Sequence, residues 1–332
     1  MLYRSMLRLL AGAFSVLVVL ALVGTWFVFE LTRVGPLLEE RTVVVVRGTG
    51  TVQIAQQLTE AGVSRWSPLF VAAAAIGRVT AGYEPRAGEY LFAPGVSVLE
   101  VFEQMRHGRT VVHRLTVVEG VTVAQVVALI KAEPGLIGEI TELPREGSLL
   151  PDTYHFALGD SRLALLQRMQ AAMNAAITEM WSSRVPGSLL LNPSQAVVLA
   201  SIVEKETALP AERPRIAGVF LNRLATGMRL QSDPTVVYAL TGGKGALGRP
   251  LTRADWRFES PINTYHVDGL PPGPIGNPGR ASLLAVLHPE HHDYLYFVAD
   301  GHGGHAFAKS LAEHNENVVR WHQVQHGPSE QK

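Results

Sequence analysis

The sequence predicts an α+β protein in which an N-terminal transmembrane helix precedes a small α/β subdomain and a larger α+β domain. Three observations carry this prediction. Residues 9–29 contain no charged side chain. A strand–turn–helix pattern then occurs three times before residue 132, and two long helical patterns with a Gly/Pro-rich stretch follow. Strands and helices grouped in this way are typical of α+β domains.

The apolar run LLAGAFSVLVVLALVGTWFVF, residues 9–29, is close to the roughly 20 residues that a helix needs to cross a bilayer. A secretory signal has a shorter apolar core and a small-x-small cleavage site, which is not evident around residues 27–30. We therefore expect an uncleaved anchor, whereas a buried core helix of a soluble protein is the alternative. Arg4 and Arg8 precede the run, which predicts a cytoplasmic N-terminus.

Composition narrows the function classes. With 332 residues the chain has room for two domains, and its 29 basic and 29 acidic residues balance. No net positive charge draws it to a polyanion, so we expect no nucleic-acid partner. The chain has no cysteine, which excludes disulfides, thiolate catalysis and Cys-ligated metal.

Each of the three strand–turn–helix units has a glycine in its turn, then a hydroxyl residue that can cap the helix. Shared local rules and a true internal repeat both explain this. The strand, glycine and cap are, in order, residues 43–46 with Gly48 and Thr51, residues 90–92 with Gly95 and Ser97, and residues 115–118 with Gly120 and Thr122.

The first of these units, VVVVRGTGTVQIAQQLTEAG, resembles a LysM-type carbohydrate-binding module. In such modules a strand ends in a Gly-Thr or Gly-Ser turn before a helix, and a shallow groove holds N-acetylated sugars. A plain α/β structural unit explains the same 20 residues, so sugar binding by this unit is an open alternative.

Two helices are predicted in the second half of the chain. Ser161 to Trp181 is amphipathic and should pack on a core, and Asn192 or Ser194 can cap the helix that follows. The stretch 242–279 is rich in Gly and Pro but also contains aromatic and polar residues, so an ordered loop is expected there. Long ordered loops often carry function.

Glu206 is the carboxylate that the helical period selects. In the segment SQAVVLASIVEKET, Glu206 lies within about 60° of the apolar stripe Leu199, Ile202 and Val203. A carboxyl group on a buried stripe has a raised pKa and can act as a general acid. Glu204 and Lys205 point elsewhere and should face solvent or form pairs on the helix surface. The alternatives for Glu206 are a solvated surface residue and an ordinary ion pair, for instance with Arg213 or Arg215.

Four long blocks resemble the signature segments of the endolytic murein transglycosylases, the MltG or YceG-like family. They are ASIVEKET, FLNRLATGMRLQSDPTVVYAL, INTYHVDGLPPGPIGNPGRASLLAVLHP and YLYFVADGHGGHAF, in this order. The similarity is strongest over residues 146–321. It implies that the second acid of EKE, Glu206, is catalytic, in agreement with the helical argument.

The resemblance implies a lytic transglycosylase, a carbon–oxygen lyase without cofactor. It would cleave the β-1,4 bond between N-acetylmuramic acid and N-acetylglucosamine inside peptidoglycan strands, leave 1,6-anhydro ends and so terminate nascent strands. The expected organisation is a cytoplasmic tip and transmembrane anchor at 1–31, a linker at 32–40, a LysM-like α+β subdomain at 41–145, a catalytic domain at 146–325 and a flexible tail at 326–332. The catalytic domain would lie outside the inner (plasma) membrane, and peptidoglycan synthases are potential partners.

Further polar residues in the family blocks are candidates for binding sugar groups: Gln231, Asp233, Asn263, Thr264, Tyr265 and Asn277. Asp233 would also be the partner if the enzyme were a hydrolase of the two-carboxylate kind. A residue before proline often serves as a turn or cap, so we assign Asp233 a supporting role. The loop 270–279 could form a wall of the glycan cleft or only pack the fold.

Two rival functions remain at this stage. Several histidines lie in the C-terminal part, so one rival function is metal-dependent hydrolysis. No HExxH motif is present, however, and we expect no metal site. The other rival is a non-catalytic scaffold that binds glycan and docks synthases. The histidines concerned are His288, His291, His292, His302 and His305.

Overall fold

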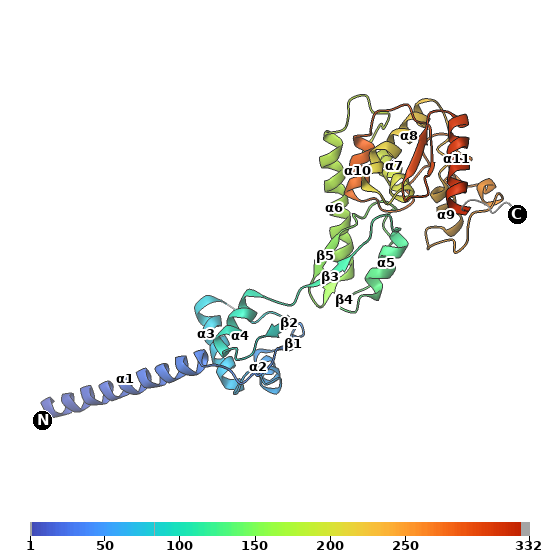
Figure 1. Cartoon of the computed structure of the whole chain (residues 1–332). Coiled ribbons are helices and arrows are strands. Elements are labelled where there is room, and N and C mark those ends of the chain that lie inside the picture. Colours follow the sequence, from blue (N-terminus) through green and yellow to red (C-terminus); the bar gives the residue numbers. More distant parts are fainter. Residues whose placement is uncertain (1, 83, 327–332) are drawn as a thin grey trace. The chain divides into compact units, whose positions relative to one another are not determined.

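The computed structural model describes residues 2–82 and 84–326. The fold is mixed α and β, as predicted, and has two compact units (Figure 1). One comprises Met1–His113 with Ala157–Gly159, and the other Arg114–Phe156 with Asp160–Lys332. The expected boundary at 145/146 therefore falls inside the second unit.

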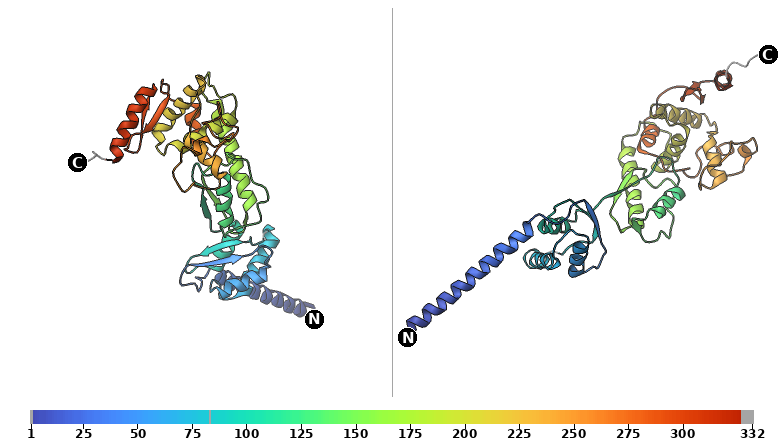
Figure 2. Two further views of the ribbon diagram at one scale, coloured as in Figure 1. Left: turned by 90° about the vertical axis from the view of Figure 1, so that its right-hand side faces the viewer. Right: turned by 60° about the horizontal axis from the view of Figure 1, so that its bottom comes forward.

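The helix α1 (Leu2–Thr32) projects from the first unit as a single rod (Figures 1 and 2). Its segment Met6–Thr32 contains an 18-residue window with a mean hydropathy of 2.4 and is long and apolar enough to cross a membrane. Hydroxyl groups inside it are satisfied locally, since Ser15 and Thr25 each donate to the carbonyl four residues back, at 2.8 Å. A helix that satisfies its own polar groups suits an apolar surrounding.

The first unit folds around an antiparallel pair of strands. Its elements are β1 (Arg41–Val45), α2 (Thr51–Glu60), α3 (Ser67–Ala81), β2 (Gly88–Phe92) and α4 (Val98–His107). Val43 and Val45 are buried while Val44 between them is exposed, which is the alternation of a half-buried strand. Val43 pairs with Tyr90, and Tyr90 stacks on Phe92 in the core. The helix α3 has no counterpart among the sequence predictions.

The three predicted strand–turn–helix units are confirmed. Ser97 and Thr122 cap α4 and α5 (Val123–Ala132) in complete capping boxes with Glu100 and Gln125. The predicted cap of the first helix is wrong by one residue, because α2 begins at Thr51 and Gly50 occupies the cap position without a side-chain bond.

The second unit begins with a small layer around α5. The strand β3 (His113–Thr116) pairs with β5 (Thr153–Phe156), and β4 (Leu136–Ile137) runs parallel to β6 (Asp160–Ser161). The long helix α6 (Arg162–Ser182) closes this layer with its first half, through Leu165 and Met169. The helix is amphipathic, as predicted, although Leu163 in its first turn is exposed.

The rest of the second unit is built around α7 (Pro193–Glu206). It packs against α6, α8 (Arg213–Ala225) and α10 (Arg280–Leu287) (Figure 1). Asn192 caps it, as expected, by accepting from the Gln195 amide at 3.0 Å. The hairpin of β7 (Tyr296–Ala299) and β8 (His305–Ala308) packs on α11 (Leu311–His326), and α9 (Asp233–Thr241) precedes the predicted long loop.

Asn277 joins the two layers of the second unit. Its backbone exchanges hydrogen bonds with the 120–121 turn, from Gly120 N at 2.8 Å and to Val121 O at 2.9 Å, and its Oδ1 accepts from Leu149 N at 3.0 Å. Gly276 must be glycine here, because a Cβ would lie 2.5 Å from the Gly120 carbonyl oxygen. This junction fixes the third strand–helix unit to the α7 layer, which explains why residues 114–145 belong to the larger unit.

Candidate active site

Glu206 is the last residue of α7 and lies on the predicted apolar stripe. Leu199, Ile202 and Val203 are fully buried. The helix ends directly after Glu206, since Thr207 is extended with φ −142°. Glu206 itself is partly buried.

The surroundings raise the pKa of Glu206 to about 7. Burial is the largest cause, because it disfavours the ionised form, and the negative charge of Asp233 adds to it. A hydrogen bond from the Ser232 hydroxyl group to Oε1 and the positive charges of His305 and Arg223 act in the opposite direction. The carboxyl group can thus hold a proton near neutral pH and also exist as an ion, as an acid/base group requires.

The turn before α9 aims Ser232 at Glu206. Gln231 has a left-handed backbone, with φ 48°, which non-glycine residues rarely adopt. Its amide donates to the Thr264 carbonyl at 3.1 Å, and the Ser232 amide donates to Thr264 Oγ1 at 2.9 Å. Ser232 is buried, whereas the predicted site residue Gln231 is exposed.

Asp233 opens α9 beside this turn and is held by two aromatic side chains. Its Oδ1 accepts from Tyr265 Oη at 2.7 Å and from Trp256 Nε1 at 2.9 Å. The two rings stack with centroids 6.0 Å apart. Burial, followed by the hydrogen bond to Asp233, raises the pKa of Tyr265, so it stays a neutral donor. The predicted residues Asp233 and Tyr265 are thus in contact with each other and within electrostatic reach of Glu206.

Three other predicted residues lie inside the protein with protein partners. Asn263 is buried and donates to the carbonyls of Trp256 and Phe258, and Thr264 is buried between Ser232 and Thr235. Asn277 is buried at the junction described above. All three shape the backbone around the site in this structure, and sugar binding by them stays a prediction.

Glu204 forms an ion pair, but neither faces solvent nor pairs on the helix surface as expected, because the pair is buried. Its side chain is 3% exposed and pairs with Arg213, Nη2 to Oε1, at 2.7 Å. Its other oxygen accepts from Gly279 N at 2.8 Å. Periodicity gave the direction of this side chain but not its burial, because the turns at 119–122 and 275–279 cover this side of α7. Arg213 therefore pairs with Glu204 and Arg215 with Glu290, so the alternative of an ion pair between Glu206 and either arginine is wrong.

The structure also brings in residues that the sequence analysis did not assign to the site of Glu206. For Ser232 the signal in the sequence was its position between two predicted residues, Gln231 and Asp233. For His305 the signal was its place among the crowded histidines. Arg223 and Glu212 carried no signal. Arg223 is buried on α8, where it donates to the carbonyls of Leu295 and Leu230 at 2.7 and 2.6 Å.

Three of the crowded histidines have separate side-chain partners. His292 contacts the Arg215 carbonyl at 2.9 Å, His288 the Ser183 hydroxyl at 3.2 Å and His305 the Glu212 carboxylate at 2.7 Å. Within residues 2–82 and 84–326, no group of three or more His, Asp or Glu side chains is arranged to hold a metal ion.

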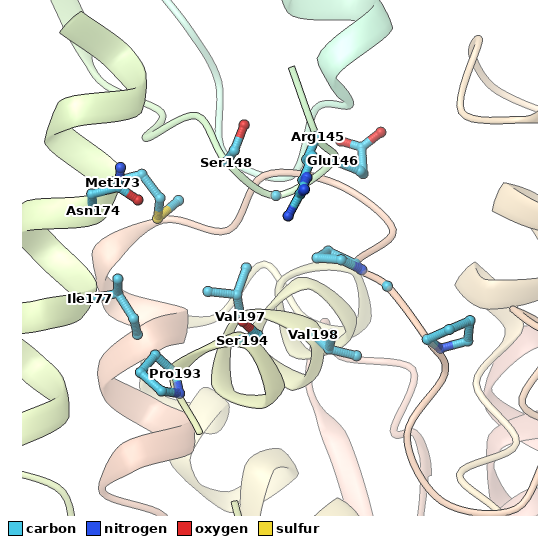
Figure 3. A pocket seen from close by; sticks show the side chains of 14 residues that line it. Arg145, Glu146, Ser148, Met173, Asn174, Ile177, Pro193, Ser194, Val197 and Val198 are labelled. Carbon is cyan, nitrogen blue, oxygen red and sulfur yellow. The ribbon is translucent and has the colours of Figure 1, made fainter. Parts of the chain in front are cut away.

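Two pockets flank the loop 270–279. One, of about 460 Å³, is lined by Asp233, Lys205, Tyr238 and Ile275 among others and so adjoins the surroundings of Glu206. The other, of about 560 Å³, lies between α6, the start of α7 and the segment Pro272–Pro274 (Figure 3). Arg145 points into it over α7 (Figure 3). The loop is therefore a pocket wall on both sides, while binding of glycan there stays a prediction.

A helix of membrane-spanning length and a carboxyl group with a raised pKa at the end of a buried helix characterise this protein. The chain belongs to the YceG-like family, whose model matches residues 43–320. Proteins named endolytic murein transglycosylase are among its relatives. The one from Bacillus subtilis is 41% identical over 178 residues, covering 52% of this chain and 47% of the relative. The one from Streptococcus pneumoniae is 27% identical over 326 residues, covering 84% and 58%.

A crystal structure of a yceG-like protein from Listeria monocytogenes is also similar. It is 31% identical, covers 84% of this chain and 99% of its own, and has a TM-score of 0.51. The chain spans about half the length of the endolytic murein transglycosylases it matches.

Proposed function

We propose that this protein is a membrane-anchored endolytic transglycosylase of peptidoglycan. It cleaves the β-1,4 bond between N-acetylmuramic acid and N-acetylglucosamine within glycan strands and leaves 1,6-anhydro ends. The observation that carries the proposal is Glu206, whose pKa of about 7 suits a group that both gives and takes a proton. The names of the relatives support the substrate class.

One carboxyl group serves both steps. Protonated Glu206 donates its proton to the glycosidic oxygen as the bond to C1 of the muramic sugar breaks. The resulting carboxylate then takes the proton from the C6 hydroxyl group as that oxygen attacks C1. No water is consumed, and Glu206 returns to its protonated form. The Ser232 hydroxyl group and the charges of Arg223 and His305 stabilise the carboxylate between the two steps.

Asp233 supports the site in this mechanism and does not take part in the chemistry. A hydrolase with two carboxylates needs the second one directed at the sugar or at a water. Oδ1 of Asp233 instead holds Tyr265 and Trp256. Its negative charge near Glu206 favours the protonated acid, which the first step needs.

The pocket beside Asp233 is the proposed place for a sugar next to the cleaved bond. Its lining combines the apolar side chains of Val237 and Ile275 with the polar groups of Lys205 and Gln125. Sugar sites use this combination, because each ring has apolar C–H faces and polar edges. Gln231 and Tyr265 are not fully buried and can reach sugar groups from the neighbouring turn.

The anchor suits this function. We propose that α1 crosses the inner membrane once with its N-terminus in the cytoplasm, and that residues 41–325 work outside on strands as they emerge. Peptidoglycan synthases are the proposed protein partners, and sugar binding by the LysM-like residues remains part of the proposal.

The test is digestion of purified sacculi by the full-length protein in detergent, with products identified by mass spectrometry. The wild type should release 1,6-anhydro-muropeptides, and Glu206→Gln should bind sacculi but release none. Glu316→Gln, the same change at an exposed position on α11, is the control and should cut normally. Reducing ends would identify a hydrolase, and no release by the wild type would identify a scaffold. Full cutting by Glu206→Gln would overturn the role of Glu206.

A further inference from the structure

A second carboxylate, Glu212, is hydrogen-bonded to His305, whose charge acts on Glu206. Glu212 lies in a short 3₁₀ turn, Pro210–Glu212, and His305 begins β8. Glu212 Oε2 is 2.7 Å from His305 Nδ1, and Oε1 accepts from the His305 amide at 2.9 Å. Both side chains are only about one-sixth exposed, at 15% and 16%. This pair is held on two sides, unlike a surface ion pair.

The pair is tied to the end of α7. The Thr207 hydroxyl group, one residue after Glu206, donates to Glu212 Oε2 at 3.2 Å. The same oxygen of Thr207 accepts from the Leu209 amide at 3.0 Å, which fixes the turn between them. His305 in turn packs edge-on against Phe297, with ring centroids 5.4 Å apart. The imidazole therefore has a fixed position relative to the last turn of α7.

The pairing sets the protonation of the ring. Burial works to raise the pKa of Glu212, but the hydrogen bonds from the side chain and backbone of His305 outweigh it and hold this pKa below its usual value. An ionised carboxylate only accepts, so Nδ1 of His305 carries the proton.

We propose that Glu212 and His305 form a positioning pair for Glu206, in which Glu212 fixes the imidazole and the imidazolium stabilises the carboxylate form of Glu206. This inference rests on the proposed function for its role in turnover. The charge of His305 is felt at the Glu206 carboxyl group. Once Glu206 has protonated the glycosidic oxygen, a fixed positive charge nearby lowers the free energy of the carboxylate without any rearrangement.

The other groups around Glu206 define what the pair adds. Arg223 on α8 contributes a positive charge, and Asp233 at the start of α9 contributes a negative charge. Tyr265, in the loop after α9, is neutral. Arg223 is permanently charged. His305 is thus a second positive neighbour of Glu206, and Glu212 holds it in place.

The first test is the pH dependence of kcat/KM on sacculi with the full-length protein. Activity requires protonated Glu206 and should fall as the pH rises through its pKa. His305→Gln removes the positive neighbour and should move this alkaline limb to higher pH, by about 0.5–1 unit for a charge interaction of this kind. Asp233→Asn should move it to lower pH. His302→Gln, an exposed histidine of the same loop, should leave it unchanged.

The second test does not depend on activity. The full chain is labelled with ¹³C in glutamate carboxyl groups, titrated in detergent micelles and compared with Glu206→Gln to assign the Glu206 signal. The Glu206 titration should shift upward in His305→Gln and in Glu212→Gln, and the double variant should shift no further than His305→Gln. Unchanged titration in folded His305→Gln overturns the pair. If sacculi are not cut but the shift is found, the pair stands and the proposed function fails.

Discussion

Ser232 donates a hydrogen bond from its hydroxyl group to Oε1 of Glu206, across a separation of 26 residues in the sequence. The left-handed Gln231 and the bond from the Ser232 amide to Thr264 hold this hydroxyl group in place. A donor directed at the carboxyl group favours the ionised form. The pKa of Glu206 therefore reflects a balance in which burial prevails over Ser232, His305 and Arg223.

Replacing Ser232 by alanine should disturb this balance without unfolding the protein. Because the donor to the carboxylate is lost, the pKa of Glu206 should rise further, by about 1 unit for a hydrogen bond to a charged group. The alkaline limb of kcat/KM on sacculi should move up by the same amount, while the acid step slows, because the carboxylate that this step forms has lost its donor. An unchanged limb in Ser232→Ala would show that this hydrogen bond does not form in solution.

Glu206 should also make stability depend on pH. Its folded pKa, about 7, lies above the ordinary 4.5, so the folded state binds the proton more tightly than the unfolded state. The stabilising contribution is complete below about pH 4.5 and is lost as the pH rises through about 7. At pH 8 the free energy of unfolding of Glu206→Gln should therefore exceed that of the wild type by about 1–3 kcal/mol.

At pH 4.5 the two proteins should have similar free energies of unfolding, so the measurement at this pH is the control for the measurement at pH 8. Urea unfolding followed by circular dichroism at both pH values measures the difference. Equal stability of the two proteins at pH 8 would mean that Glu206 ionises freely in the folded state.

The buried pair of Glu204 and Arg213 should matter for stability and not for the reaction. Arg213→Met leaves the carboxylate of Glu204 buried without its partner, at a cost of about 3–5 kcal/mol. Arg229→Met is the matched control, because Arg229 makes a bond of similar length, 2.8 Å, to Asp268 at the surface. Exposed pairs contribute about 0–1 kcal/mol. Similar losses in the two variants, measured by urea unfolding, would show that Glu204 is not buried in solution.

The sequence by itself determined the features that depend on neighbours along the chain. The apolar run at 9–29 predicts the long helix α1 because its length and lack of charge are local properties. The caps Ser97 and Thr122 were predicted because capping joins residues three apart. The position of Glu206 on the stripe of Leu199 and Val203 follows from the helical period.

Only the tertiary structure decided which distant groups meet these residues. Periodicity predicted that Glu204 leaves the apolar stripe, but the turns that cover it, and its pairing with Arg213, depend on the path of the whole chain. The contacts of Ser232 and His305 around Glu206 likewise join segments from separate elements. A local pattern fixes the direction of a side chain relative to its own helix. Its burial, its partners and hence its pKa are set by the segments that pack against that helix.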